Sequence, residues 1–160
     1  MTKQIPLTQG KVALVSDHRF EYLNQWKWTA SKTQGKRYAV NSSKGKMHRL
    51  ITGAPVGMDV DHVDGDGLNN QDENLRVCTH AENGYNRRKL ASNNTTGYKG
   101  VSIFRDGKFV RYQAKIRVAS KLLHLGLFTT AEAAARAYDQ AAREHFGDFA
   151  ALNFPNDSVT

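Results

Sequence analysis

Four residues combine the side chains that metal-assisted hydrolysis needs: Asp61, His62, Asn74 and Asn83. The Asp61 carboxylate is a hard oxygen ligand suited to Mg²⁺ or Mn²⁺, and the amide of Asn83 can add a neutral oxygen. His62 follows Asp61 directly, so in a strand it points to the opposite face, where it can take a proton from water attacking a phosphate. A side-chain or backbone oxygen near Asn74 can hold the imidazole in the required tautomer.

These residue types alone also fit a surface ion pair and turn-forming asparagines. The elements around them favour the chemical interpretation. A short strand is predicted around Val60 and another over Leu75–Cys78, with a loop rich in Asp, Gly and Asn from 64 to 74 between them. Two strands and a following helix that pack together can bring the four side chains to one point.

The helix after the second strand has a clear start. Its first residues form a capping box, with Thr79 as the N-cap and Glu82 reaching back to it. The helix is expected to run to about Lys89, which places Asn83 one turn inside it. The segment 91–96 lacks apolar periodicity and is predicted to be a linker.

The first 50 residues show short strand-like runs separated by polar turns. Trp26 and Trp28 alternate with Lys27, which predicts that one face of their strand is buried. The lysine-rich stretches 31–36 and 42–46 are predicted hairpin loops whose tips contact phosphates, although edge lysines also protect a sheet from aggregation. The predicted runs are Lys11–Val15, Trp26–Ala30, Arg37–Val40 and Met47–Ile51.

The residue pattern of the C-terminal part of the chain predicts a second unit, in which three antiparallel strands precede a helix. Asp106-Gly107 indicates a tight turn in the first hairpin. A second capping box at residues 129–132 opens a helix that ends near Phe146, with Gly147 as its stop. The predicted strands are Tyr98–Phe104, Phe109–Val118 and Leu122–Phe128.

Composition limits the possible function classes. The chain has 160 residues, with 23 Lys+Arg against 15 Asp+Glu and a formal net charge of +8, a length that fits one domain or two small ones. No apolar run approaches the roughly 18 residues of a membrane span, and no signal-peptide segment is seen, so we expect a cytoplasmic protein. The positive charge favours a polyanionic partner, with nucleic acid first and an acidic membrane surface second.

The charge is unevenly distributed along the chain. Residues 1–50 carry 10 basic and 2 acidic residues, residues 51–96 carry 4 and 7, and residues 97–160 carry 9 and 6. The acidic middle segment would repel a polyanion unless something neutralised it. A bound divalent cation is one candidate, and the alternative is a solvated loop that faces away from the ligand.

Two other sites fail on inspection. The stretch 64–67 starts like a calcium loop, but Leu68 and Leu75 fall where ligands are required. Cys78 lies in an apolar strand, so we expect a buried packing residue rather than a nucleophile, and a single cysteine excludes CxxC-type zinc. His48 stays open as a phosphate contact or as a residue lining the active site.

The middle of the chain resembles the HNH homing endonucleases, free-standing or intron-borne nucleases common in phages. The matching residues are Met47–Ile51, Asp59–Asp66, Asn74–Cys78 and Asn83. Members share a ββα-metal active site, and the subgroup resembled here has asparagine in the final metal-binding position. The spacing from Asp61 through Asn83 fits this pattern without gaps.

This resemblance assigns a role to each of the four residues. It implies that Asp61 and Asn83 are metal ligands, that His62 is the general base, and that Asn74 orients it. The zinc-stabilised relatives carry CxxC pairs, which this chain lacks, so structural zinc is not expected and the cofactor is a divalent Mg²⁺ or Mn²⁺.

The C-terminal unit resembles the Apetala-two (ethylene-response-factor) DNA-binding domain, whose three-stranded sheet lies in the DNA major groove while a helix covers the other side. The matching residues are Gly97–Val101, Ala114–Arg117, His124–Phe128, Ala133–Ala134, Arg136–Asp139 and Leu152–Phe154. The chain departs from the family at Ser102, Phe104 and His124, where arginines or tryptophan are common. The DNA-binding role can therefore transfer while the target sequence does not.

Strand alternation predicts which residues of this sheet face the DNA. Tyr112, Ala114, Ile116 and Val118 suit the helix face, and the intervening long polar residues point to the other side. The predicted DNA-binding set is Lys99, Arg111, Gln113, Lys115, Arg117 and His124.

Together these observations predict an α+β protein of two domains. Residues 1–90 hold N-terminal β hairpins and a ββα-metal nuclease module with its core motif at 47–90, residues 91–96 form a linker, and residues 97–155 form the DNA-binding domain. The predicted function is a metal-dependent, sequence-specific DNA endonuclease, of a homing type that nicks. Its expected partner is double-stranded DNA, without a membrane or a small-molecule substrate, and it is expected to act as a monomer or weak dimer in the host cell of a phage or mobile element.

Two alternatives remain open at this point. One is a DNA-binding regulator with an inactive nuclease module, although Asp61, His62 and Asn83 are all present. The other is a nuclease acting on structured RNA, because phosphate contacts alone do not separate the two nucleic acids.

Overall fold

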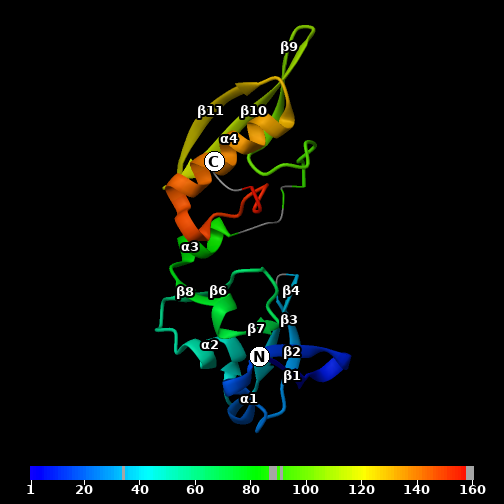
Figure 1. Ribbon diagram of the computed structural model, residues 1–160, viewed down its shortest axis with the longest axis vertical. Helices are drawn as coiled ribbons and strands as arrows, with labels where there is room; N and C mark the ends of the chain where they lie inside the picture. Colours follow the sequence, from blue (N-terminus) through cyan, green and yellow to red (C-terminus); the bar gives the residue numbers. More distant parts are fainter. Residues whose placement is uncertain (34, 87–89, 91, 158–160) are drawn as a thin grey trace. The chain divides into compact units, whose positions relative to one another are not determined.

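The protein is described by a computed structural model that covers residues 1–33, 35–86, 90 and 92–157. Its contacts divide the chain into two compact units, Met1–Gly84 and Tyr85–Thr160 (Figure 1). The first unit combines small sheets with short helices, and the second packs one three-stranded sheet on one long helix, which confirms the α+β class. Among the described residues, no helix is long and apolar enough to cross a membrane.

The first unit contains three small sheets with the strand orders β1-β2-β7, β3-β4-β5 and β6-β8. Strands β1 and β2 pair antiparallel, whereas β2 and β7 pair in parallel. The strands are β1 (Thr2–Pro6), β2 (Val12–Ser16), β3 (Thr29–Thr33), β4 (Lys36–Asn41), β5 (Gly45–Lys46), β6 (Asp59–His62), β7 (Asn69–Asn70) and β8 (Leu75–Cys78). The helices are α1 (Asp17–Leu23), α2 (Met47–Thr52) and α3 (His80–Tyr85), with one-turn 3-10 helices at Thr8–Gly10 and Asp72–Asn74.

One hydrophobic core joins these sheets. Trp28 is its largest fully buried side chain, and its indole N–H donates to the Leu23 carbonyl oxygen at 2.8 Å, so the ring can be buried without losing a hydrogen bond. The prediction that the segment with Trp26 and Trp28 buries one face is confirmed, because Trp28 is buried and the partly buried Trp26 packs against the core. The core residues are Ile5, Leu7, Ala13, Val15, Leu23, Trp28, Ala30, Ala39, Met47, Ile51, Val60 and Leu75.

The predicted strand at Met47–Ile51 is wrong, because this segment forms helix α2. Met47, His48 and Ile51 are its buried residues, a spacing that places them on one helix face. The Arg49 guanidinium donates to the carbonyl oxygens of Ala54, Pro55 and Met58 and so fixes the chain that leaves the helix. The predicted segment has five residues and includes His48 and Arg49. So short a segment does not show whether its apolar residues follow the period of a helix or of a strand, which is why the prediction failed.

Other predicted boundaries moved by a few residues. The strand expected at Trp26–Ala30 begins at Thr29, and the loop expected at 31–36 is mostly paired strand. Strand β1 and helix α1 were not predicted. Thr79 and Glu82 form the predicted capping box, with Glu82 Oε2 accepting from the Thr79 backbone N–H at 2.8 Å. The predicted end of that helix at about Lys89 and the start of the linker at 91 lie outside the described residues.

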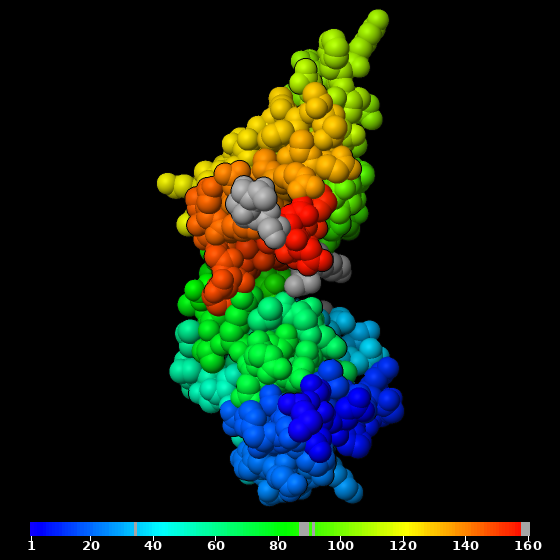
Figure 2. Space-filling model, in the orientation of Figure 1, coloured from blue at the N-terminus to red at the C-terminus, as the bar shows by residue number. Residues whose placement is uncertain are grey.

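The second unit is a three-stranded antiparallel sheet covered on one face by a helix. The sheet order is β11-β10-β9, and α4 lies across β10 and β11 (Figure 1). Figure 2 shows the tip of the β9–β10 hairpin standing out from this unit. The elements are β9 (Val101–Asp106), β10 (Phe109–Val118), β11 (Lys121–Phe128) and α4 (Ala131–Phe146), followed by a 3-10 turn at Gly147–Phe149.

Small side chains let α4 approach the sheet closely. Ala114 on β10 and Ala134, Ala135 and Ala142 on α4 are completely buried. Thr130 caps this helix, because its hydroxyl accepts from the Ala133 backbone N–H at 3.1 Å. The cap lies one residue after the start of the capping box predicted at residues 129–132, and the Glu132 carboxylate accepts instead from the Tyr98 hydroxyl. The helix therefore has both a fixed start and a close packing face.

The chain after α4 is held against this helix by a buried carboxylate. Asp139 is 2% exposed and accepts hydrogen bonds from the backbone N–H groups of Asn153 and Phe154, both at 2.8 Å. The side-chain oxygen of Asn153 accepts in turn from the Lys99 backbone N–H at 2.7 Å. Asp139 therefore links the end of the unit to its beginning through Asn153.

Gly100 is a position in this unit that only glycine can fill. Its φ is +75°, and a Cβ there would lie 2.0 Å from Cδ2 of Tyr138. Gly100→Ala should lower the free energy of unfolding by about 2–5 kcal/mol, from the left-handed backbone and the overpacking together. Urea unfolding followed by circular dichroism measures this loss.

Gly107→Ala is the matched control. Its φ of +55° carries a similar backbone cost, but nothing lies within 4 Å of the added Cβ. An equal loss in the two variants would contradict the steric part of the prediction.

Candidate active site

The pairing of β6 with β8 sets the positions of the predicted catalytic residues. In this antiparallel pair Asp61 lies opposite Arg76 and His62 lies opposite Leu75. Side chains alternate along a strand, so Asp59 and Asp61 share one face while Val60 and His62 share the other. Asp61 and His62 are buried, at 4% and 5% exposed.

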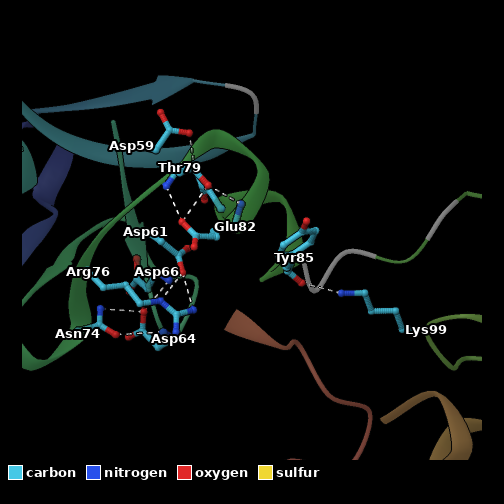
Figure 3. Close-up of polar contacts among 11 residues, drawn as sticks. Asp59, Asp61, Asp64, Asp66, Asn74, Arg76, Thr79, Glu82, Tyr85 and Lys99 are labelled. Atoms are coloured by element: carbon cyan, nitrogen blue, oxygen red, sulfur yellow. Dashed lines mark hydrogen bonds and ion pairs between the residues drawn. The ribbon is translucent and has the colours of Figure 1, made fainter. Parts of the chain in front are cut away.

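Asp61 forms a buried ion pair with Arg76. Its Oδ2 accepts from Nε at 2.9 Å and from a terminal guanidinium nitrogen at 2.7 Å, and Figure 3 shows the Arg76 side chain turned toward it. A buried carboxylate requires such a partner, because taking a charge out of water costs several kcal/mol. Arg76 was not among the predicted site residues.

Asn83 reaches the same face of β6 from helix α3. Its amide Nδ2 donates to Oδ2 of Asp59 at 3.0 Å, and His80 Nδ1 lies 3.0 Å from the same oxygen. The Asn83 and His80 contacts lower the pKa of Asp59. The structure therefore brings Asn83 to the strand that carries Asp61, with its amide nitrogen directed at Asp59.

His62 lies among two other aromatic side chains on the opposite face of β6. Its ring centroid is 5.0 Å from that of His48 on α2 and 5.9 Å from that of Tyr38 on β4. Burial lowers the pKa of His62, while Asn70 and the carboxylates of Asp64 and Asp61 act in the opposite direction. The imidazole is therefore neutral at neutral pH, the state in which a histidine accepts a proton.

Asn74 fixes the loop that follows His62. Its Oδ1 accepts from the Asp64 backbone N–H at 3.0 Å, and its Nδ2 donates to Asp64 Oδ1 at 3.0 Å and to the Asn69 carbonyl oxygen at 2.8 Å. Its own carbonyl oxygen accepts from the backbone N–H of Val63, the residue after His62. Asn74 thus holds the backbone on both sides of the turn.

The second unit separates the predicted DNA-binding residues by face. On β10 Ala114 and Ile116 are buried under α4, whereas Arg111 and Arg117 are exposed. Opposite positions on the outer face pair Gln113 with Leu127, Lys115 with His124 and Arg117 with Leu122. The outer face therefore mixes long donors with apolar side chains.

Lys99 lies apart from the other five residues. Its ammonium donates to the Tyr85 carbonyl oxygen at 2.9 Å, as Figure 3 shows, and stands 5.9 Å from the ring centroid of Tyr138 on α4. Tyr138 is on the helix side of the sheet, so Lys99 is directed away from the outer face.

The structure also bears on Cys78. Its side chain is completely buried, as expected for a packing residue. Burial, followed by the charges of Asp61 and Asp59, raises the pKa of the thiol to about 11, so the thiolate that a nucleophile requires is scarce at neutral pH.

Comparisons with known proteins identify the family of this chain. A family model described as HNH endonuclease matches residues 47–85. An uncharacterised HNH endonuclease of Acanthamoeba polyphaga mimivirus is 32% identical over 153 residues, which cover 91% of this chain and 76% of the relative. The chain belongs to the HNH endonuclease family.

A third match is confined to part of the chain. Protein 3.8 of Escherichia phage T7 is 44% identical over 48 residues, which cover 30% of this chain and 39% of that protein. The viral HNH endonuclease, by contrast, is similar along most of the length, including much of the second unit. Family membership makes this chain a DNA-cleaving hydrolase.

HNH nucleases generally use a divalent metal ion, and the donors present here suit one. Within the described residues no group of three or more His, Cys, Asp or Glu side chains could hold a metal. The face that carries Asp61 instead offers carboxylate oxygens and the amide oxygen of Asn83, whose nitrogen is already bound to Asp59. Hard oxygen donors in small number fit an ion that keeps several waters, as Mg²⁺ does.

Sequence reasoning missed three residues of this site: Tyr38, Asp59 and Arg76. Asp59 had a usable signal, because it stands two residues before Asp61 and so shares its face of the strand. Arg76 lies in a predicted strand, but its place opposite Asp61 depends on the register of β6 with β8, which the spacing of neighbouring residues does not contain. Tyr38 had none, since its strand belongs to another sheet.

Acid should destabilise the first unit through His48. Burial, with smaller contributions from His62, Lys46 and Arg49, lowers the pKa of His48 from 6.5 to about 3. As the pH falls below 6.5, His48 is protonated in the unfolded chain but stays neutral in the folded chain. The contribution of His48 to the free energy of unfolding is therefore fully present above pH 6.5 and is lost as the pH falls toward 3. Between about pH 7 and pH 5 the loss is roughly 2 kcal/mol.

Urea unfolding followed by tryptophan fluorescence measures this effect. The His48→Phe variant should lose less stability than the unmodified protein over the same pH interval. Identical pH dependence of the two proteins would contradict a buried, neutral His48.

Proposed function

We propose that this protein is a metal-dependent, sequence-specific DNA endonuclease of the homing type, which nicks one strand per active site. The observation that carries the proposal is the buried Asp61–His62 pair, whose side chains lie on opposite faces of β6. One face supplies oxygen ligands and the other a neutral imidazole. This separation lets the same strand hold a cation and a base without pairing them to each other.

His62 is the general base in this mechanism. The neutral ring takes a proton from the water that attacks the phosphodiester phosphorus, and the turn held by Asn74 fixes the backbone next to it. Asp61 and Asn83 would hold Mg²⁺ or Mn²⁺, which when bound supplies Lewis-acid stabilisation of charge on the phosphate and leaving oxygens. Arg76 holds the Asp61 carboxylate in place.

The second unit is the part that positions the enzyme on its site, in the manner of an Apetala-two-type domain. Supporting this, long donors alternate with buried residues along β10, and the face opposite α4 carries Arg111, Gln113, Lys115 and Arg117. Such side chains read base edges and phosphates in a major groove. His124 contributes through Gln113, whose amide nitrogen lies 3.2 Å from its Nδ1.

Plasmid cleavage tests the catalytic assignment. The protein with Mg²⁺ or Mn²⁺ should convert supercoiled DNA to open circles, and EDTA should stop the reaction. His62→Ala should lower the rate by at least about 100-fold, because a positioned base contributes 10²–10⁴. His145→Ala, which changes an exposed histidine, is the matched control.

The products separate the remaining alternatives. Linear DNA at early times would indicate paired active sites, and equal cleavage of a matched RNA duplex would overturn the preference for DNA. A salt-sensitive mobility shift on a library of sites without any cleavage would favour a DNA-binding regulator. Unchanged cutting by His62→Ala would remove the base assignment.

Binding measurements test the second unit. Arg111→Ala and Lys115→Ala should each weaken DNA binding. If the two side chains contact phosphates, each substitution should also reduce the slope of log K against log salt concentration by about 1. Arg136→Ala is the control, because this arginine lies on α4 and pairs with Asp157. Equal effects at all three positions would argue against the outer sheet face as the DNA surface.

A further inference from the structure

The rings of Tyr38, His48 and His62, which come from separate parts of the first unit, form one cluster. Tyr38 comes from β4, His48 from α2 and His62 from the end of β6. The ring centroids of Tyr38 and His48 are 5.4 Å apart at an interplanar angle of 70°, and those of His48 and His62 are 5.0 Å apart at 87°. These are edge-to-face contacts, the arrangement that aromatic pairs prefer.

The chain makes room for this cluster at Gly67. A Cβ at this position would lie 2.7 Å from Cδ1 and Cε1 of Tyr38 and 2.3 Å from the Arg37 carbonyl oxygen. The loop after β6 therefore packs directly on the edge of the tyrosine ring. Lys46 stands over the same ring, with its Nζ 5.4 Å from the centroid. The loop, the lysine and the two imidazoles thus surround part of the half-buried ring of Tyr38.

Hydrogen bonding through Nδ1 does not explain the place of His48 in this cluster. It is 5% exposed, and its Nδ1 is buried without a hydrogen-bond partner among the described residues. An apolar side chain of similar size would avoid that cost. What the imidazole provides is a flat ring whose contact with His62 is nearly perpendicular.

We propose that Tyr38 and His48 are positioning residues, whose rings enclose the imidazole of His62 and hold it in the orientation needed to accept a proton. The inference rests on the proposed role of His62 as the base. Asn74 holds the backbone of the turn through Asp64 and Asn69, and the two rings hold the side chain. Neither ring takes part in bond making or breaking.

Substitutions at Tyr38 separate the ring from its hydroxyl. Tyr38→Phe keeps the ring and should leave kcat within about two-fold, whereas Tyr38→Leu removes it and should lower kcat by about 10- to 100-fold, the range expected for a misplaced catalytic group. KM and DNA affinity should stay unchanged in both. Tyr22→Leu is the matched control, because Tyr22 packs edge-to-face on Trp26 at 4.8 Å and does not contact His62.

Each kinetic outcome decides the proposal. A loss in Tyr38→Phe as large as that in Tyr38→Leu would assign the effect to the hydroxyl and overturn the role of the ring. A change in KM alone would indicate substrate binding, and an unchanged kcat in Tyr38→Leu would leave a purely structural residue. The pair His48→Phe and His48→Leu repeats the comparison at the second ring. We expect kcat to be retained in His48→Phe and lowered in His48→Leu.

A readout without cleavage distinguishes failure of this proposal from failure of the proposed function. The Cε1–Hε1 NMR signal of His62 in the metal-free, DNA-free protein should shift or split in Tyr38→Leu and His48→Leu, because ring-current shielding and a single ring orientation are lost. It should be unaffected in Tyr22→Leu. An unmoved signal in both leucine variants would overturn the packing argument even in a protein that cuts DNA.

Discussion

Strand β6 pairs with β8 so that Asp61 faces Arg76 while His62 faces Leu75 and the core. The rest of the first unit depends on this register, because a slip of one residue would move every side chain of β6 to the other face. The carboxylate would then enter the aromatic cluster and the imidazole would face Arg76. The helix that carries Asn83 follows β8 directly, so its start is fixed by the same pairing.

Burying two polar side chains on neighbouring positions of one strand requires a different solution on each face. On the first face Arg76 offsets the desolvation of Asp61 through two hydrogen bonds to one oxygen. On the second face no opposite charge is required, because burial lowers the pKa of His62 and keeps the imidazole neutral. The imidazole packs there against neighbouring aromatic rings. The pleat of a single strand thereby keeps the Asp61–Arg76 ion pair and the His62 imidazole on separate faces.

The acidic segment between the basic flanks has an internal explanation as well. Asp61 and Asp72 pair with Arg76 and Arg19, and Asp64 accepts from Asn69 and Asn74. Asp66 accepts from the Leu68 backbone N–H, and Glu82 from that of Thr79. Much of the negative charge in this segment therefore shapes the loop and the start of helix α3.

Local patterns were sufficient for elements whose signals lie within a few residues. The strand Leu75–Cys78, the ten-residue strand Phe109–Val118 and the capping box at Thr79 were confirmed, because alternation and capping are properties of neighbouring residues. The second cap lies at Thr130, one residue after the start of the predicted box. The α+β class and the HNH family followed from the same stretches. The pattern failed where the segment was too short to show its period, as at Met47–Ile51.

The sequence by itself identified Asp61, His62 and Asn83 by type and spacing as candidates for the chemistry, and the resemblance to the HNH nucleases added the role expected of Asn74. Only the tertiary structure decided what surrounds them. Tyr38 and Arg76 reach the site through the packing of separate sheets and the register of β6 with β8, and neither is encoded in the spacing of nearby residues. Contacts between segments distant in the chain depend on how faces pack, which a one-dimensional pattern does not contain.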